Sequence, residues 1–194
     1  MQYLTALLIL ITTTEISAQI KKPTAISVSY FGETITHPGL KIGLDYELKS
    51  WDGNKKKSTQ QTISKSIILS SNIGFYFHQD YQTGVFALPE LRYSRKNQKG
   101  NFRSVGLGVG YMRTFIPNVY EVNTANEIKR TTEGNNYFLT TCFVAFGKDL
   151  SVKYSIPMGV YIKPQIMYAL PNYPNGVTYF ALEIGINYKL TSGK

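Results

Sequence analysis

The chain has 194 residues, a length that suits a single domain, and its 15 Tyr and 10 Phe exclude a disordered chain, which lacks the apolar groups that offset the entropy of ordering. One Cys excludes an internal disulfide, and with only two His we expect no metal and no cofactor. The formal charge of +9 comes with only 17% charged residues, below the usual ~25% of soluble domains.

Residues 1–18 have the features of a secretory signal peptide. The apolar run from Leu4 to Ile11 is too short for a membrane-spanning helix, which needs ~20 residues. Small residues, Ser17 and Ala18, precede Gln19. We therefore expect a cleaved signal peptide and a mature domain over residues 19–194.

After this segment, apolar residues recur at every second position, which indicates strands with one apolar face. In the last run, Phe180, Ile184 and Ile186 share one face, while Glu183 and Gly185 lie on the other. A slip by one residue would move every apolar side chain to the opposite face, so the pattern specifies the register.

Turn residues divide the chain into about eight strands. The expected strands are Ala25–Gly32, Gly39–Ser50, Ser64–His78, Gly84–Lys96, Asn101–Ile116, Asn136–Lys148, Ser151–Leu170 and Val177–Leu190. The run Asn136–Lys148 is ambiguous because it is apolar on both faces. In the run Gly39–Ser50, alternation predicts Lys49 on the polar face with Glu47.

Alternation alone fits a soluble lipocalin-like barrel, with its apolar face inside, or a transmembrane barrel, with that face toward lipid. Most expected strands have 12 residues or more, longer than the ~5–6 of globular strands and sufficient for the ~9–11 that cross a bilayer. Aromatic residues near strand ends suit the headgroup level. They are Tyr30, Phe31, Tyr46, Phe75, Phe77, Tyr93, Tyr111, Phe115, Tyr137, Tyr168 and Tyr188. These features favour an all-β, antiparallel up-and-down transmembrane β-barrel of about eight strands.

Charges of both signs lie on the polar face, in the middle of the expected strands. They are Lys41, Asp45, Glu47, Glu90, Arg92, Lys163 and Glu183. Inside a narrow barrel such charges must pair, and the interior of eight strands is only wide enough for side chains, so we expect a lumenal charge network and no open pore. A proton or small-ion path is the alternative for these residues.

On this pattern the chain resembles the small eight-stranded outer-membrane barrels of the OmpA/OmpX type from Gram-negative bacteria. The resemblance covers Ala25–Leu190 and is most specific in the final strand, Thr178–Leu190. It implies an outer-membrane location among lipid, both termini in the periplasm, and insertion by the barrel-assembly machinery, which reads an aromatic residue that Tyr188 approximates. It brings no residue-level functional motif, so we expect a structural or surface-interaction role and no enzymatic activity.

This orientation places the longest connection, Pro117–Asn135, outside the cell as the candidate site for an extracellular partner. Basic residues gather at the periplasmic rim, where they are expected to face anionic headgroups or cell-wall polymer, or to be solvated. The run Lys55–Lys57 lacks interleaved aromatic residues, so no nucleic-acid partner is expected.

A lipid-modifying barrel enzyme is the alternative function from another class. His37, His78 and Asp80 fall in adjacent outer loops, and a His held by a carboxylate is half of a catalytic triad. The nucleophile is missing, because Ser71 is expected to face lipid and Ser70 lies roughly 26 Å along the strand from His78. A soluble lipocalin-like binder of apolar ligands is the third reading, and Cys142 is interpreted as lipid-facing or as core packing.

Overall fold

The computed structural model describes residues 22–33, 37–53, 63–79, 81–122, 128–171 and 176–190. The expected signal peptide, residues 1–18, lies outside them. The elements are β1 (Ala25–Glu33), β2 (His37–Gly53), β3 (Ile63–His78), β4 (Gln82–Asn97), β5 (Asn101–Val122), β6 (Ile128–Glu133), β7 (Asn136–Asp149), α2 (Ser151–Tyr154), β8 (Met158–Leu170) and β9 (Val177–Lys189).

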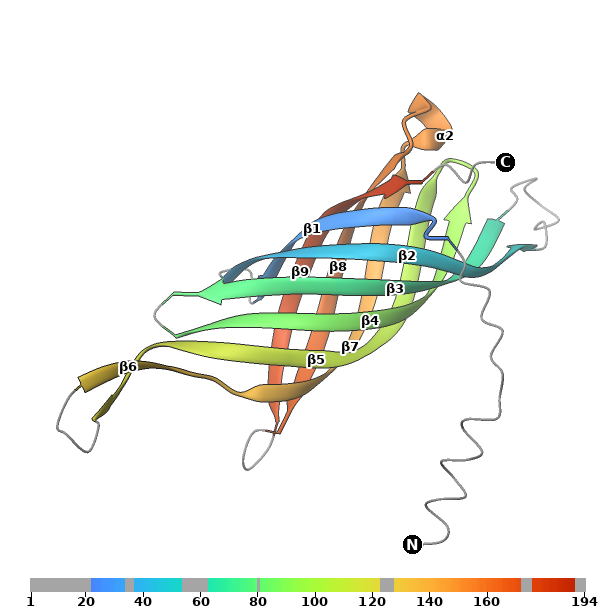
Figure 1. Ribbon diagram of the computed structural model, residues 1–194. Helices are drawn as coiled ribbons and strands as arrows, with labels where there is room; N and C mark the ends of the chain where they lie inside the picture. Colours follow the sequence, from blue (N-terminus) through green and yellow to red (C-terminus); the bar gives the residue numbers. More distant parts are fainter. Residues whose placement is uncertain are drawn as a thin grey trace, which may run out of the picture.

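Eight of the strands form a closed antiparallel ring (Figure 1). The order runs β4-β3-β2-β1-β9-β8-β7-β5, and pairing of β4 with β5 closes it. The predicted all-β, up-and-down barrel of eight strands is therefore confirmed. Among the described residues, no helix has the length and apolar character needed to cross a bilayer.

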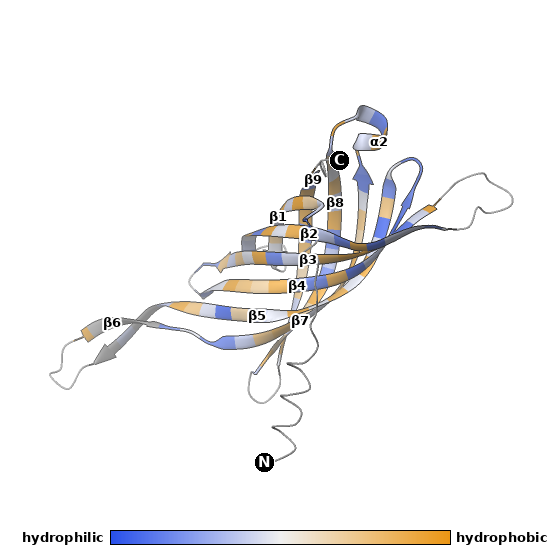
Figure 2. Cartoon of the chain, turned by 45° about the vertical axis from the view of Figure 1, so that its right-hand side comes forward, coloured by the Kyte–Doolittle hydropathy of each residue, from blue (hydrophilic) through white to orange (hydrophobic). Residues whose placement is uncertain are grey.

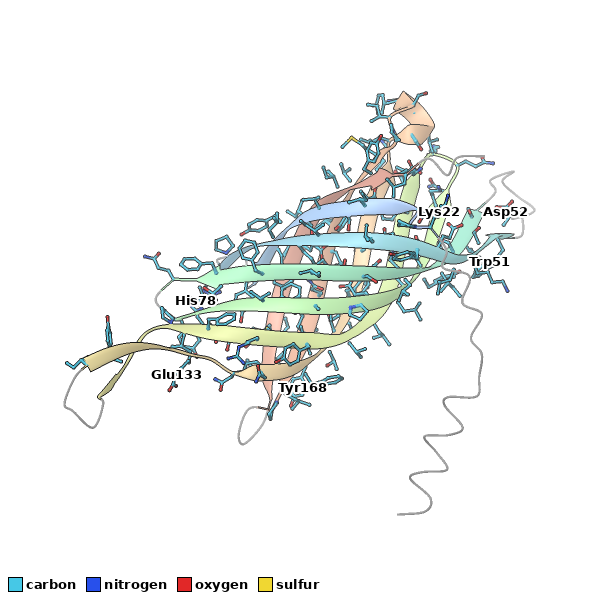
Figure 3. All side chains as sticks on the ribbon, in the orientation of Figure 1. Lys22, Trp51, Asp52, His78, Glu133 and Tyr168 are labelled. Carbon is cyan, nitrogen blue, oxygen red and sulfur yellow. The ribbon has the colours of Figure 1, made fainter. Side chains whose placement is uncertain are left out.

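The two ends of the barrel carry different parts of the chain (Figure 3). Lys22, Trp51 and Asp52 lie at one end, which we call the terminal end, and the backbone of Leu190 donates a hydrogen bond to Thr24 there. The other end carries the hairpin of β5 and β6, including Glu133, and is called the hairpin end. Both ends of the described chain thus meet at one end of the barrel, as an even number of strands requires.

The connection predicted as a loop over Pro117–Asn135 contains regular structure. β5 continues to Val122 and pairs with β6, with an irregular register between Ile116 and Val119. Pro117 lies in that irregularity, where a residue without an amide proton costs no ladder hydrogen bond. The sequence interpretation ended the strand at this proline, but beyond it a two-stranded ribbon extends past the ring (Figure 1).

The predicted strand Ser151–Leu170 starts later than expected. Ser151–Tyr154 forms the single helical turn α2, and Ser155 follows in the left-handed conformation with a φ of 56°. Pro157 cannot continue a helix, and β8 begins at Met158. Residues 151–157, predicted as the start of this strand, therefore lie outside it, although Tyr154 and Ile156 are apolar at alternate positions.

The predicted position of Lys49 on the polar, lumenal face is wrong because β2 contains a bulge. Glu47 pairs with Ile68, but Lys49 pairs with the adjacent residue Ile67, so the register shifts between them. Because opposed residues share a face, the shift turns Lys49 to the outer face, where its ammonium group lies 6.0 Å from the Trp51 ring. A pattern of strict alternation cannot detect this extra residue.

The aliphatic face of the strands points away from the lumen. Ile73, Leu107 and Phe180 are 67%, 66% and 63% exposed, and similar residues alternate along every strand of the ring (Figure 2). A surface of this extent has no place in water on a monomeric protein. The lipocalin-like arrangement, with an apolar lining inside, is the reverse of the one observed.

Inside the barrel, each of several glycines lies directly opposite an aromatic residue. The pairs are Gly74–Phe86, Gly84–Tyr76, Gly106–Phe143, Gly147–Phe102 and Gly185–Tyr161. A Cβ atom on Gly84 would lie 2.2 Å from the Tyr76 ring, so the ring occupies the space that a side chain would need. Such pairing fills a narrow interior with flat rings laid over bare backbone.

The hairpin end of the lumen is filled with apolar side chains. This apolar plug consists of Phe31, Tyr76, Phe86, Leu88, Met112, Tyr137, Leu139, Met167, Ala169 and Ala181. Phe31 and Tyr137, predicted to lie at the headgroup level, are 1% and 8% exposed and point inward instead. The ambiguous strand β7 supplies part of the plug from one face and outward residues such as Phe138 and Val144 from the other.

We predict that Gly106→Ala destabilises the barrel by about 1–3 kcal/mol, the usual cost of overpacking. The new Cβ would lie 2.4 Å from the Phe143 ring and 2.7 Å from the carbonyl oxygen of Leu91, and backbone cannot withdraw cheaply. Urea unfolding in detergent micelles measures the change. Gly53→Ala is the matched control, since its Cβ meets only the flexible side chain of Lys65 and backbone at 3.0 Å or more. Equal stabilities of the two variants would contradict the packing argument.

Candidate functional site

Four buried charges meet in the middle of the lumen and form the ion quartet: Lys41, Glu90, Lys163 and Glu183. The Lys41 ammonium lies 2.6 Å from Glu183 and 3.2 Å from Glu90. The Lys163 ammonium lies 2.7 Å from Glu183 and 2.9 Å from Glu90. Each cation therefore contacts both carboxylates. All four side chains are at most 4% exposed, so these contacts are shielded from water.

The quartet ties together strands that are not neighbours. Lys163 on β8 and Glu183 on β9 are direct cross-strand partners. Lys41 on β2 and Glu90 on β4 reach them across the lumen, because neither strand is adjacent to β8 or β9 in the sheet. The cluster therefore spans the lumen from one side of the barrel to the other.

Neutral donors complete the quartet. The hydroxyls of Ser29 and Tyr161 donate hydrogen bonds of 2.9 and 2.6 Å to Glu183, and the Lys163 ammonium lies 4.5 Å from the Phe143 ring centre. Buried ions need such partners, because the attraction between them offsets their desolvation only when the geometry is good. The sequence analysis missed these donors, although alternation places all of them on the lumenal face.

A second ion pair lies nearer the terminal end. Arg92 contacts Asp45 at 2.6 Å, and the Ser70 hydroxyl donates to the same carboxylate at 2.6 Å. The Arg92 side chain is 20% exposed, so this pair borders solvent. Lys41, Asp45, Glu90, Arg92, Lys163 and Glu183 of the predicted lumenal network thus form the ion pairs given above. Glu47, also predicted for this network, lines the cavity beside Arg92.

A third ion cluster closes the terminal end and was not predicted. Asp149 accepts from Lys189, from Lys96 at 3.1 Å and from the Ser151 hydroxyl at 2.6 Å. The Asp149 side chain is 5% exposed, so these donors replace the hydrogen bonds that water would otherwise supply to its carboxylate. Asp149 was read as a turn residue, and Lys189 as the end of a strand.

A polar cavity of about 340 Å³ lies between these last two clusters. Its lining includes Asp45, Glu47, Arg92, Lys96 and Asp149. Toward the hairpin end, the ion quartet comes next along the lumen, followed by the apolar plug. Within the described segments, no group of three His, Cys, Asp or Glu side chains is arranged to hold a metal ion.

The two histidines lie together near the hairpin end. The rings of His37 and His78 stack with centres 3.5 Å apart, and Tyr81 lies 5.0 Å from His78. Asp80, the carboxylate proposed for the triad, lies outside the described residues. Ser70 donates to Asp45 in the lumen, and Ser71 is exposed on the outer face. Neither serine is placed as a nucleophile for these histidines.

We predict that Lys163→Met lowers the free energy of unfolding by about 3–5 kcal/mol, because it leaves two buried carboxylates with one cation. Lys163→Met combined with Glu90→Gln restores the charge balance, so the double variant should lose less than the sum of the two single losses. Urea unfolding in detergent measures all three. Lys99→Met, in an exposed turn, is the control and should change stability by less than about 0.5 kcal/mol. Simple additivity of the two single losses would contradict the coupling.

Comparison with known proteins concerns the fold. No protein-family model and no curated protein matches the sequence. Among solved structures, the outer membrane enzyme PagL has a TM-score of 0.51 at 9% identity, covering 86% of this chain and 99% of PagL. Neisserial surface protein A (NspA) also has a TM-score of 0.51 at 9% identity, covering 86% of this chain and 96% of NspA. The chain therefore has the fold of the eight-stranded outer-membrane β-barrels, as the resemblance to the OmpA/OmpX type implies.

Proposed function

We propose that this protein is an outer-membrane barrel with a sealed lumen, which serves as a rigid base for the surface hairpin β5–β6. The observation that carries the proposal is the combination of an outward aliphatic belt with an interior closed by the ion quartet and the apolar plug. The belt suits lipid, since only helices and closed barrels satisfy their backbone groups in a bilayer. The location also rests on the fold shared with outer-membrane proteins.

The sealed lumen argues against transport. Eight strands leave an interior that side chains can fill, and here charged groups at the centre and apolar groups toward the hairpin end do fill it. The ion quartet is balanced, with two cations and two carboxylates, so its role in this proposal is to hold strands together across the lumen.

The hairpin supports a role at the cell surface. β5 has 22 residues, and its last part leaves the ring to pair with β6 alone (Figure 1). Large apolar side chains are exposed on it, with Tyr120 at 58% and Ile128 at 73%. An isolated two-stranded ribbon is marginally stable in water, and an open strand edge is a template for pairing with another chain. An extracellular partner that adds a strand or covers these residues fits this surface.

Catalysis is not part of the proposal. The stacked histidines lie at the same end as the hairpin, but Ser70 and Ser71 lie in the middle of β3, where Ser70 donates to Asp45 and Ser71 lies on the outer face. The barrel-assembly machinery remains an expected partner during insertion, with Tyr188 near the end of β9 as its recognition residue.

An epitope tag tests both the location and the orientation. Inserted between β5 and β6, the tag should be labelled by antibody on intact cells, and the protein should fractionate with outer membranes. The same tag inserted in the Asn97–Gly100 turn, at the terminal end, should be labelled only after permeabilisation. The reverse pattern would overturn the orientation, and a protein that stays soluble without detergent would overturn the membrane assignment.

A further inference from the structure

Three basic residues lie side by side on adjacent strands at the terminal end. Lys65 on β3 is the direct partner of Arg95 on β4, and Arg95 is the direct partner of Arg103 on β5. Residues opposite one another share a face, and these three alternate in step with outward residues such as Val105, so all three lie on the outer face. We call them the basic row.

The basic row works against the stability of the isolated barrel. Like charges directly opposite on neighbouring strands repel one another. Among the residues that the structure describes, no carboxylate forms an ion pair with any of the three, although the inward residues Arg92 and Lys96 on the same strand β4 are both paired. The charge of the basic row is therefore left for an anion outside the protein.

Apolar and aromatic residues surround the basic row. Two positions further toward the middle of the barrel, on the same face, lie Ile67, Tyr93 and Val105. At the two ends of the basic row, Trp51 is the direct partner of Lys65, and Phe146 is the direct partner of Arg103. The neighbouring row and the two flanking aromatic residues place the cations at the edge of the aliphatic belt, where interfacial aromatic residues also belong.

The positions of Trp51 and Tyr93 also indicate the edge of the aliphatic belt. Their ring centres are 6.2 Å apart, and the Lys49 ammonium lies 6.0 Å from the Trp51 ring. Trp51 lies at the terminal end in Figure 3. An amphipathic ring beside a cation, with aliphatic residues on one side and the strand end on the other, is typical of the headgroup level.

A hollow of about 500 Å³ adjoins the basic row, lined by Arg95, Arg103, Ile63 and Phe146 among others. This volume falls within the range of small-ligand sites, ~300–1,000 Å³. Its lining combines guanidinium groups, which bind phosphate in a bidentate manner, with apolar side chains that suit the start of an acyl chain.

We infer that the basic row is a binding site for the phosphate of an anionic phospholipid in the inner leaflet of the outer membrane. This inference rests on the proposed function, because it requires the barrel to be inserted with its terminal end in the periplasm. The lipid is favoured over cell-wall polymer because the basic row adjoins the aliphatic belt, so the phosphate that reaches it must come with acyl chains beside Tyr93 and Val105. On one side of the barrel, the predicted rim of basic residues would thus bind a specific class of ligand, the phosphate of an anionic phospholipid.

Trp51, the single tryptophan of the chain, reports directly on this site. The full-length mature protein is reconstituted into phosphatidylethanolamine vesicles that contain either phosphatidylglycerol or phosphatidylcholine with brominated acyl chains, which quench tryptophan on contact. We expect stronger quenching by the anionic lipid. Each basic residue near an anionic surface contributes about a fivefold factor in binding, so Lys65→Gln/Arg95→Gln/Arg103→Gln should lower the preference for phosphatidylglycerol by roughly 100-fold. High salt should lower the preference of the wild-type protein as well.

Arg113→Gln is the matched control, because Arg113 is an exposed, outward arginine at the hairpin end whose guanidinium donates to Asn136. It should leave the quenching preference unchanged. The triple variant loses like-charge repulsion, so it should still fold and show the change in gel mobility on heating that is typical of folded barrels. If it does not fold, the three single variants are tested instead, and each should lower the preference for phosphatidylglycerol about fivefold.

Equal quenching by both brominated lipids in the wild-type protein would overturn the inference, as would a preference that survives the triple substitution. Binding to purified cell-wall sacculi that the triple variant loses, without any lipid preference, would assign the basic row to the polymer instead. Absence of quenching by either lipid would show that the protein is not inserted, which would overturn the proposed function itself.

Discussion

The width of an eight-stranded ring is the constraint on which the rest of this structure depends. Once β4 pairs with β5, the closed ring is narrow, and the protein's own side chains fill much of its interior. Aromatic rings laid over glycines provide part of this filling. The 15 Tyr and 10 Phe of the sequence therefore have a structural role inside the barrel as well as at its rims.

The filling changes along the barrel axis. The apolar plug occupies the hairpin end, the ion quartet the middle, and the Arg92–Asp45 pair, a polar cavity and the Asp149 cluster the terminal end. Each buried cation in the middle contacts two carboxylates, which is the arrangement that makes burial of charge tolerable. The apolar plug carries no charged side chain, and its polar groups are the hydroxyls of Tyr76 and Tyr137.

Alternation predicted which residues face the lumen, but it did not predict which of them meet. Lys163 and Glu183 are cross-strand partners. They lie on two expected strands that follow one another in the sequence, so a contact between them is the kind that the sequence can suggest. The contacts of Lys41 and Glu90 across the lumen depend on the stagger of the closed ring, which no single strand encodes. For the same reason Asp149 and Lys189, from β7 and β9, were not recognised as one cluster.

Two errors of the sequence interpretation have their physical origin in local breaks of alternation. One extra residue in β2 turns Lys49 outward, and Pro117 lies in an irregular register within β5 instead of ending it. Phe31 and Tyr137 were placed at the headgroup level because aromatic residues at strand ends usually lie there, but the lumen near the hairpin end needed large side chains to fill it. Position along a strand does not determine the face; register does.

Ion flux in proteoliposomes tests the central claim, a barrel in lipid that its own side chains seal. The protein is incorporated into vesicles loaded with a potassium-sensitive dye, and flotation shows that the protein and the lipid move together. If the barrel is sealed, potassium should cross the vesicle membrane no faster than in protein-free vesicles. Addition of a known ionophore should then give rapid flux, which shows that the dye responds. Steady potassium flux proportional to the amount of incorporated wild-type protein would contradict a sealed barrel.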